Sequence, residues 1–470
     1  MGKILGAYVL PHPPIIIPEI GKGQESKAAK TIRSMKQIAS DISKKKPDTI
    51  IIVTPHGPLF TDAISILYED KLIGDFKRFG SEGIYFEIIN NKKIVDNIIE
   101  KASYKDIVCA KIDKEFASDY DVDYKLDHGA LVPLYFIKKE YSDFKLVHIT
   151  YGLLSSIELY QFGMILKQVI EESEENIVFI ASGDLSHKLT KDAPSGYNAR
   201  GKDFDEMVVK LLESGDREGL MKIDFTFAEI AGECGLRSIM IMCGLLDGYK
   251  TVSEVISYEY PFGVGYCVSY TEIEGISKNN MLLDKLIKYE KEKMQRIREN
   301  EDEYVRLARE SLEYFIKNGK VMDIPVNVNK EMIMNKAGVF VSIKKDGKLR
   351  GCIGTIAPTE ENIAKEIIRN AIKAGTEDPR FYPVEEDELE RLKYSVDIIK
   401  EPEEIDTIEK LDIKKYGVIV RKGYKMGVLL PDLEGVDSPE EQVLIALRKA
   451  GIRPDEGYIL ERFEVIRHCG

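Results

Sequence analysis

Short apolar runs alternate with segments of helical spacing along the chain up to Tyr270. The runs are rich in Ile, Val and Tyr, a composition typical of buried strands. Residues 27–46 and 155–173, which lie between runs, place their apolar residues at helical spacing. The alternation predicts an α/β fold with a mostly parallel sheet and flanking helices. The predicted strands are LGAYVL (5–10), TIIIV (49–53), FKLVHITYG (144–152), NIVFIAS (176–182) and GYCVSYTEI (265–273).

The pattern changes after Glu272. Residues 279–320 are highly charged, have no Pro or Gly before Gly319, and carry apolar residues at helical spacing. We therefore predict a connecting helix that runs into the first helix of a second domain.

The rest of the chain has strand-like and helix-like segments of its own. Asp346 and Gly347 stand between two alternating runs, which is a good hairpin signal. Predicted strands here are AGVFVSIKK (337–345), KLRGCIGTI (348–356), YSVDIIK (394–400) and YGVIVRK (416–422), with helices at 361–375 and 438–451. The sequence thus predicts three parts: an α/β domain in 1–275, a helical linker in 276–302 and an α+β domain in 303–470.

Composition narrows the class of protein. A chain of 470 residues fits two or three domains, and 44% apolar with 31% charged residues is typical of a soluble globular protein. No run approaches the roughly 18 consecutive apolar residues of a membrane span, and the N-terminus lacks a signal-peptide pattern. The net charge of −13 argues against a general affinity for nucleic acid. The six cysteines form no C-x-x-C pair, so neither a zinc ribbon nor a disulfide framework is expected, and we predict a reduced, cytoplasmic protein.

Three of the six histidines come shortly after apolar runs: His12 in PHPP, His56 in TPHG and His187 in SGDLSH. In open α/β sheets, ligands bind in the crevice outside the carboxyl ends of the strands, so these side chains are expected to share one crevice. Two imidazoles with one carboxylate form the set that holds Fe(II) in oxygenases. A single histidine near a strand end is more often a plain polar loop residue, but three flanked by Pro and Gly favour a site.

Further candidates complete this set. His128 in KLDHGALVPL is a fourth histidine followed by Gly, whereas His148 lies within a strand pattern and is expected to be structural. Glu233 in AGECG is a candidate carboxylate ligand, with a helix N-terminal acid as the alternative interpretation. Cys234 competes with it, because a thiolate would suit zinc or another soft metal site.

The motifs PHPP, TPHG, DHG and SGDLSH resemble those of the class III extradiol ring-cleavage dioxygenase superfamily, which includes LigB-type subunits and Memo-like proteins. The resemblance implies non-haem Fe(II) held by His12, His56 and Glu233. It also implies His187 as the catalytic acid/base and His128 as a pocket residue that steadies substrate or oxygen. In Memo-like proteins the cysteine of the Cys-Gly pair belongs to the metal site, so Glu233 and Cys234 stay alternatives.

The second half resembles another family, the AMMECR-type domain, through LRGCIGT (349–355), DPRFYPV (378–384) and YGVIVRKGYKMGVLLP (416–431). Cys352 in the first motif is either a nucleophile or, more often in such a setting, a buried strand residue. The two modules in one chain resemble system protein A of the AmmeMemoRadiSam group. That resemblance implies a radical S-adenosylmethionine protein as partner.

Three functional hypotheses follow. The first is an Fe(II)-dependent, extradiol-type dioxygenase that cleaves an aromatic ring or performs related O2 chemistry. The second is a non-catalytic, metal-containing Memo-like binding or adaptor protein, with Zn²⁺ or no metal as alternatives to Fe²⁺. A zinc hydrolase comes last, because H-E-x-x-H is absent from the sequence. An acidic soluble chain is also compatible with a homo-oligomer.

Overall fold

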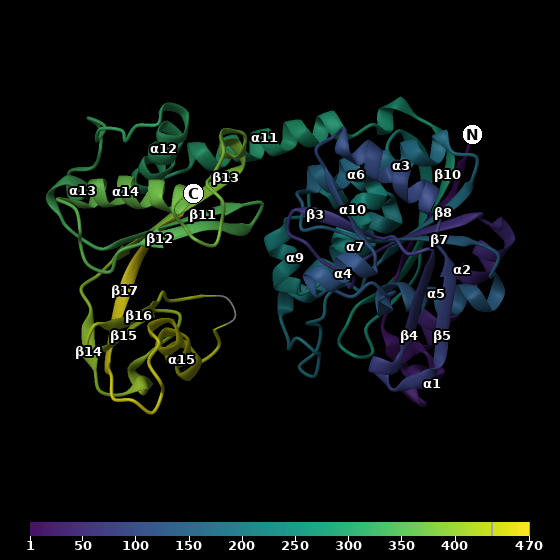
Figure 1. The fold of residues 1–470 in the computed structure, drawn as a ribbon, viewed down its shortest axis with the longest axis horizontal. Helices are drawn as coiled ribbons and strands as arrows, with labels where there is room; N and C mark the ends of the chain where they lie inside the picture. The colour runs from purple at the N-terminus through teal and green to yellow at the C-terminus, as the bar shows by residue number, and fades with distance from the viewer. Residues whose placement is uncertain (434–435, 470) are drawn as a thin grey trace. The chain divides into compact units, whose positions relative to one another are not determined.

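A computed structural model describes residues 1–433 and 436–469 and divides the chain into two compact units, Met1–Tyr289 and Glu290–Gly470 (Figure 1). The division falls inside helix α11 (Leu283–Glu299), which lies in the segment predicted as a linker. Each unit has its own sheet and its own apolar clusters.

The first unit is built on an eight-stranded sheet with the order β6-β3-β7-β2-β8-β1-β10-β9. The four central strands, β7, β2, β8 and β1, are parallel, as predicted. Both flanks are reversed: β3 is antiparallel to β7, and β10 is antiparallel to β1 and to β9. A short connection such as the one between β9 and β10 forces antiparallel pairing, since a parallel crossover needs a dozen residues or more. The strands are β1 (Lys3–Leu10), β2 (Thr49–Thr54), β3 (Ala63–Leu67), β6 (Val108–Ile112), β7 (Lys145–Thr150), β8 (Asn176–Ser182), β9 (Tyr249–Glu259) and β10 (Tyr266–Ile276).

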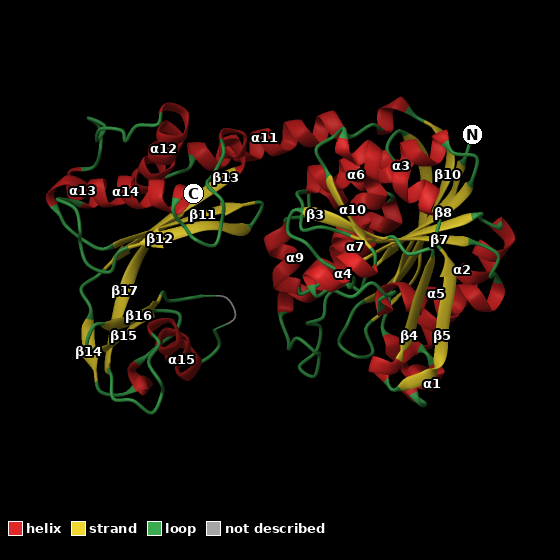
Figure 2. Cartoon of the chain, viewed as in Figure 1, coloured by secondary structure: helices red, strands yellow, loops and turns green. Residues whose placement is uncertain are grey.

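Helices cover both faces of this sheet (Figure 2). In strand β2, Ile51 and Val53 join the apolar cluster of α3, α6 and α10, whereas Ile50 and Ile52 join the cluster of α2 and α5. Successive side chains of a strand point to opposite faces, which is why an unbroken apolar run is needed here. The helices are α2 (Ala29–Lys45), α3 (Lys92–Ser103), α5 (His128–Glu140), α6 (Ser156–Glu172) and α10 (Leu236–Leu245).

Smaller elements surround this core. A hairpin of β4 (Lys71–Phe76) and β5 (Ser81–Ile89) forms a two-stranded sheet and turns through η3 (Lys77–Phe79). Further α-helices in this unit are α1 (Pro18–Gly21), α4 (Lys114–Tyr120), α7 (Ala199–Ser214), α8 (Arg217–Met221) and α9 (Phe225–Ala231).

The charged segment predicted as a helix running into the second domain forms two helices, α11 and α12 (Glu303–Asn318). The break comes at Asp302, whose carboxylate accepts hydrogen bonds from the backbone N–H groups of Tyr304 and Val305. An aspartate in this position is a strong helix start. It therefore begins a new helix.

The second unit holds a seven-stranded sheet in which the pairings run antiparallel. The long strand β17 pairs with β13 through its last residues and with β15 through its first, so it joins two parts of the sheet (Figure 1). Helices α12 and α14 pack on the β11–β13 part, and α15 packs on β15 and β16. The predicted hairpin at Asp346 and Gly347 joins β11 to β12. Bounds are β11 (Val339–Lys345), β12 (Lys348–Gly354), β13 (Leu392–Ile399), β14 (Glu403–Ile405), β15 (Tyr416–Lys422), β16 (Lys425–Leu429), β17 (Ile459–Cys469), α13 (Lys330–Met334), α14 (Ile363–Thr376) and α15 (Pro439–Ala450).

Candidate metal centre

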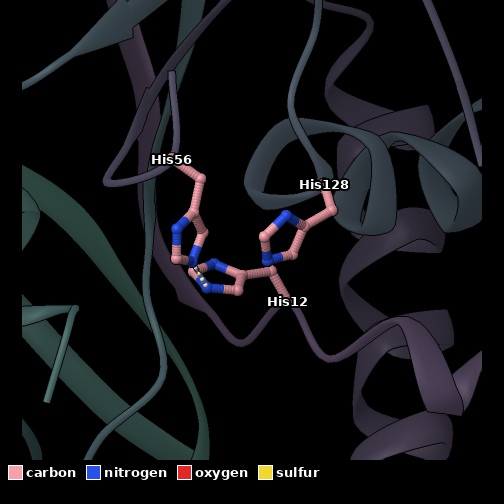
Figure 3. Close-up of side chains that lie close together, drawn as sticks. All are labelled: His12, His56 and His128. Carbon is pink, nitrogen blue, oxygen red and sulfur yellow. Dashed lines mark hydrogen bonds between the residues drawn. The ribbon is translucent and has the colours of Figure 1, made fainter. Parts of the chain in front are cut away.

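Three adjacent parallel strands deliver the predicted histidines to one place. Strands β2, β8 and β1 are neighbours in the sheet, and the loops that follow them carry His56, His187 and His12. His128 comes from elsewhere, as the first residue of helix α5. The ligand nitrogens of His12, His56 and His128 all lie within 4.8 Å of one another, and the three side chains point toward one another (Figure 3).

His12 is held in one tautomer. Its side chain is 1% exposed, and Nδ1 lies 2.9 Å from the hydroxyl oxygen of Ser182. That hydroxyl donates its own hydrogen to the carbonyl of Gly129 at 2.5 Å, so it accepts from Nδ1–H of His12. The lone pair of His12 therefore sits on Nε2, which faces His56 Nε2 at 3.0 Å. A ring nitrogen fixed by an outer partner is the usual arrangement of a histidine that ligates a metal.

Asp127 ties the loop of His56 to the start of the helix that carries His128. Its Oδ1 accepts from Thr54 Oγ1 and from Gly129 N–H, both at 2.7 Å, and Thr54 Oγ1 accepts from His56 N–H at 3.1 Å. Buried His148 donates Nε2–H to Asp127 Oδ2 at 2.7 Å. Burial alone would raise the pKa of Asp127, but the hydrogen bonds from His148 and Thr54 outweigh it and lower that pKa. The carboxylate is thus a charged anchor behind the histidines.

The four clustered imidazoles are neutral at neutral pH. Burial lowers the pKa of His12 well below its usual range, and the neighbouring imidazoles add to the effect. Burial, followed by the His128 charge, lowers the pKa of His56 to about 4. Burial also lowers the pKa of His128 and of His187. Neutral imidazole is the form that binds a metal or accepts a proton.

The turn before α10 presents two adjacent side chains to different partners. The sulfur of Cys234 lies 3.5 Å from His12 Nε2 and 3.7 Å from His187 Nε2. The carboxylate of Glu233 accepts from the backbone N–H of Leu236 at 2.6 Å, at the N-terminus of α10. Burial raises the pKa of Glu233 to about 7 and raises the pKa of Cys234 above its usual range. Glu233 as a ligand stays a prediction from the sequence.

A close approach of two backbones holds this turn in place. A Cβ atom on Gly183, in the loop after β8, would lie 2.1 Å from the Cα of Gly235. The side-chain-free contact lets the N–H of Cys234 donate to the carbonyl of Asp184 at 3.1 Å, while the N–H of Asp184 donates to the Cys234 sulfur at 3.3 Å. The glycines of the SGD and ECG motifs therefore bring Cys234 beside His187.

The donor set fits a single transition-metal ion. Such an ion lies about 2.1 Å from a nitrogen ligand and about 2.3 Å from a thiolate. For ligand–metal–ligand angles between about 90° and 109°, two nitrogens are then about 3.0–3.4 Å apart and a nitrogen–sulfur pair about 3.1–3.6 Å. The distances from His12 Nε2 to His56 Nε2 and to Cys234 Sγ match these values. The residues whose ligand atoms lie together closely enough to hold an ion are His12, His56 and His128, and the Cys234 sulfur lies beside His12.

Several supporting residues were missed from the sequence. Asp127, directly before His128, carries a readable signal, because Asp is a preferred residue just before a helix. Thr54 and Ser182 carry none, since hydroxyls at strand ends are common. Phe79, at the tip of the β4–β5 hairpin, also has no recognisable signal in the sequence. Its ring meets the His128 ring edge-on at a centroid distance of 5.2 Å, and the residue is 38% exposed.

The site therefore consists of imidazoles and a thiol at the carboxyl edge of the parallel strands of an α/β sheet, a set of residues that could hold a metal ion. More specifically, residues 6–269 match the family described as the catalytic LigB subunit of aromatic ring-opening dioxygenase, and the chain belongs to that family. Residues 305–468 match the AMMECR1 family, so the chain joins two family domains.

Relatives match the chain in whole or in part. A protein of Clostridium acetobutylicum is 49% identical over 464 residues, which cover 98% of each chain. A Thermotoga maritima protein is 49% identical over 170 residues, covering 36% of this chain and 98% of its own. A crystal structure of a Pyrococcus horikoshii protein is 32% identical, covers 35% of this chain and 88% of that one, and has a TM-score of 0.33. Among the described residues, no helix has the length and apolarity to cross a membrane.

Proposed function

We propose that the first unit binds Fe(II) and is an extradiol-type dioxygenase, an oxidoreductase that cleaves an aromatic ring or performs related O2 chemistry. The observation that carries this proposal is the 3.0 Å separation of His12 Nε2 and His56 Nε2 at the carboxyl edge of the sheet. Membership of the LigB family supports the choice of chemistry.

His12 and His56 would hold the ion. When bound, Fe(II) would bring a catechol-type substrate and O2 together and allow electron transfer between them. For the third ligand, the 3.5 Å contact of the Cys234 sulfur with His12 favours Cys234 over Glu233. The hydrogen bond from Leu236 gives the Glu233 carboxylate a different partner, the start of α10.

The other two histidines would act on the substrate. His187 stands on a separate loop with its Nε2 3.7 Å from the Cys234 sulfur. Burial lowers its pKa, so it is neutral and can accept the proton of a substrate hydroxyl. The His128 ring stacks on His56 at a centroid distance of 4.1 Å and can donate a hydrogen bond to substrate or oxygen. The half-exposed ring of Phe79 offers an apolar wall for a planar substrate.

A second candidate function is a Memo-like binding or adaptor protein that keeps a metal without turnover. The position of Cys234 favours it, because a thiolate ligand suits Zn²⁺ as well as iron. In either case we propose a cytoplasmic protein that works with a radical S-adenosylmethionine partner. Self-association of the chain is compatible with this proposal. A purified partner of that class should co-elute with the full chain in size-exclusion chromatography, and separate elution at micromolar concentrations would count against it.

Metal analysis of protein purified without oxygen tests the ligand assignment. We expect a single iron per chain in the wild type and in Glu233→Gln. Cys234→Ser should weaken iron binding by about a hundredfold. Losing a residue that only orients a ligand already costs up to about a hundredfold in metal affinity, and losing a ligand should cost at least as much. Glu233→Gln is a matched control, because the amide oxygen can still accept from Leu236. Iron lost from Glu233→Gln and retained by Cys234→Ser would instead make Glu233 the ligand.

Turnover separates the two candidate functions. His187→Ala should keep the iron of the wild type and lose ring cleavage of a catechol panel by about a hundredfold or more, since a general acid/base contributes on the order of 10²–10⁴. Oxygen uptake and product absorbance measure this loss. A wild type that holds iron and cleaves none of the catechols favours the binding protein. Turnover that survives unchanged in His187→Ala would contradict the role of His187.

A further inference from the structure

The ring of the proposed acid/base, His187, has little to orient it. In the part of the chain that the structure describes, its ring nitrogens have one contact within hydrogen-bonding distance, the Cys234 sulfur, which lies 3.7 Å from Nε2. His12, by contrast, is fixed at Nδ1 by the Ser182 hydroxyl. A catalytic base is usually oriented by a third group. The position of the His187 ring therefore depends on the backbone that carries it.

That backbone is hydrogen-bonded to two other segments of the first unit. The N–H of Leu185 donates to the carbonyl of Gly265, just before β10, at 2.8 Å. The N–H of Gly265 donates back to the carbonyl of Ser186 at 2.9 Å. On the other side, the N–H of His187 donates to the carbonyl of Gly232, just after α9, at 3.2 Å. The donor between these two, the N–H of Ser186, needs an acceptor of its own.

The acceptor for Ser186 is a buried carboxylate, Asp205 of α7. Its Oδ1 lies 2.8 Å from the N–H nitrogen of Ser186, and its Oδ2 accepts from the hydroxyl of Tyr258 on β9 at 2.7 Å. Asp205 is 0% exposed. A carboxylate in such a place is costly unless its oxygens are hydrogen-bonded, and here both are. A Cβ atom on Gly201, one turn earlier in α7, would lie 2.4 Å from the Ser186 hydroxyl oxygen, so the helix touches the loop directly.

The bond to Asp205 differs from the other two in its acceptor. The N–H groups of Leu185 and His187 donate to backbone carbonyls, whereas that of Ser186 donates to a side chain. The carboxylate also packs against the segment that holds Leu185, because a Cβ atom on Gly265 would lie 2.0 Å from Asp205 Oδ2. Asp205 is thus the point at which α7, β9 and the start of β10 meet the loop of His187.

We infer that Asp205 is a positioning residue for His187, and that it acts through the backbone N–H of Ser186. The inference rests on the proposed function, in which His187 takes a proton from the substrate. Asp205 has no part in that proton transfer. It fixes the strand-end loop so that the imidazole stays beside Cys234. A displacement of about 1 Å at a reacting group can cost on the order of a hundredfold in rate, so the loss of such a support should be measurable.

Turnover of the full chain at saturating Fe(II) is the first test. In Asp205→Ala, kcat for a catechol should fall on the order of tenfold to a hundredfold, while KM stays nearly unchanged because the groups that bind substrate remain. Asp205→Asn should restore most of the rate. Its amide oxygen can accept from Ser186, and its amide N–H can donate to the Tyr258 oxygen. Asp205→Leu, which fills the same space without an acceptor, repeats the test if Asp205→Ala does not fold.

A second buried aspartate provides the matched control. Asp247 is 3% exposed and, like Asp205, accepts from one tyrosine hydroxyl and one backbone N–H, those of Tyr160 and Leu282. It lies beyond the far end of α10, whose other end follows the Cys234 turn. Asp247→Ala should lose stability to urea much as Asp205→Ala does, yet keep the wild-type kcat. Equal losses of kcat in the two variants would overturn the inference.

Hydrogen exchange gives a result that does not depend on turnover. Amides of residues 183–190, followed by peptide mass spectrometry, should exchange about tenfold faster or more in Asp205→Ala and at the wild-type rate in Asp247→Ala. If the wild type cleaves no catechol, the proposed function fails, and exchange alone decides whether Asp205 fixes the loop. Unchanged exchange in Asp205→Ala would overturn the inference. So would faster exchange together with the kcat of an active wild type, because Asp205 would then serve stability alone.

Discussion

Replacing His12 by alanine is expected to abolish stoichiometric metal binding. His12 Nε2 is the atom shared by both short donor pairs, 3.0 Å from His56 Nε2 and 3.5 Å from Cys234 Sγ. Its removal takes away one ligand and also leaves the Ser182 hydroxyl without the ring that it orients. The dissociation constant for Fe(II) should rise by more than about a hundredfold, which is what loss of an outer partner alone can cost. Anaerobic titration with Fe(II) measures this change.

His468→Ala is the matched control for this variant. His468 lies in the second unit, where its Nδ1 contacts Asp302 at 2.5 Å and its ring stacks on Tyr304. We expect it to bind iron like the wild type. Because an alanine at a buried position can unfold the unit, His12→Gln provides a second test with a polar side chain of similar length. Full iron occupancy in a folded His12→Ala or His12→Gln would remove His12 from the metal site.

The convergence of the strand-end histidines could be predicted because it needs no knowledge of strand order. Each of His12, His56 and His187 follows its own strand within a few residues, and parallel strands end at a common edge. The continuous apolar runs also revealed strands buried on both faces. What those runs could not reveal is strand direction, so the antiparallel flanks of the sheet were missed.

Local sequence patterns could not predict which of Glu233 and Cys234 points toward the histidines. Adjacent residues in a turn point in directions set by the backbone path, and that path depends on the contact of Gly183 with Gly235, far apart in the sequence. The same holds for Asp127. Its position before a helix is readable, but its contacts with Thr54 and His148 depend on three separate segments meeting.

Asp127→Ala is expected to cost both stability and metal affinity. The change leaves His148 Nε2–H, Thr54 Oγ1–H and Gly129 N–H without their acceptor in a buried place. Each buried donor left without an acceptor costs about 1–3 kcal/mol, so the combined loss should reach several kcal/mol. Iron affinity should also fall about ten- to a hundredfold, because the loop of His56 loses its anchor. Urea denaturation followed by circular dichroism, and Fe(II) titration of the folded protein, measure the two effects.

The pH dependence of that loss identifies its cause. The pKa of Asp127 is lowered in the folded protein, so its ionised form contributes stability above the pKa of an unfolded aspartate, about 3.9, and that contribution disappears as the pH falls below it. The stability difference between the wild type and Asp127→Asn should therefore be full near pH 6 and shrink below about pH 4. A difference that stays constant as the pH falls through this range would assign the loss to shape rather than to charge.

Asp113→Ala distinguishes an anchor from an ordinary helix cap. Asp113 also precedes a helix, α4, and accepts from the backbone N–H of Phe116 at 2.9 Å. That hydrogen bond stays within the start of its own helix, whereas Asp127 also contacts Thr54 and His148 from separate segments. Its loss should cost about 1 kcal/mol and leave iron affinity unchanged. If Asp127→Ala behaved in the same way, the carboxylate would only start α5, and the position of His56 would depend on the Pro and Gly beside it. A joint loss of stability and iron confined to Asp127 would instead mean that one buried carboxylate holds two sides of the metal centre together.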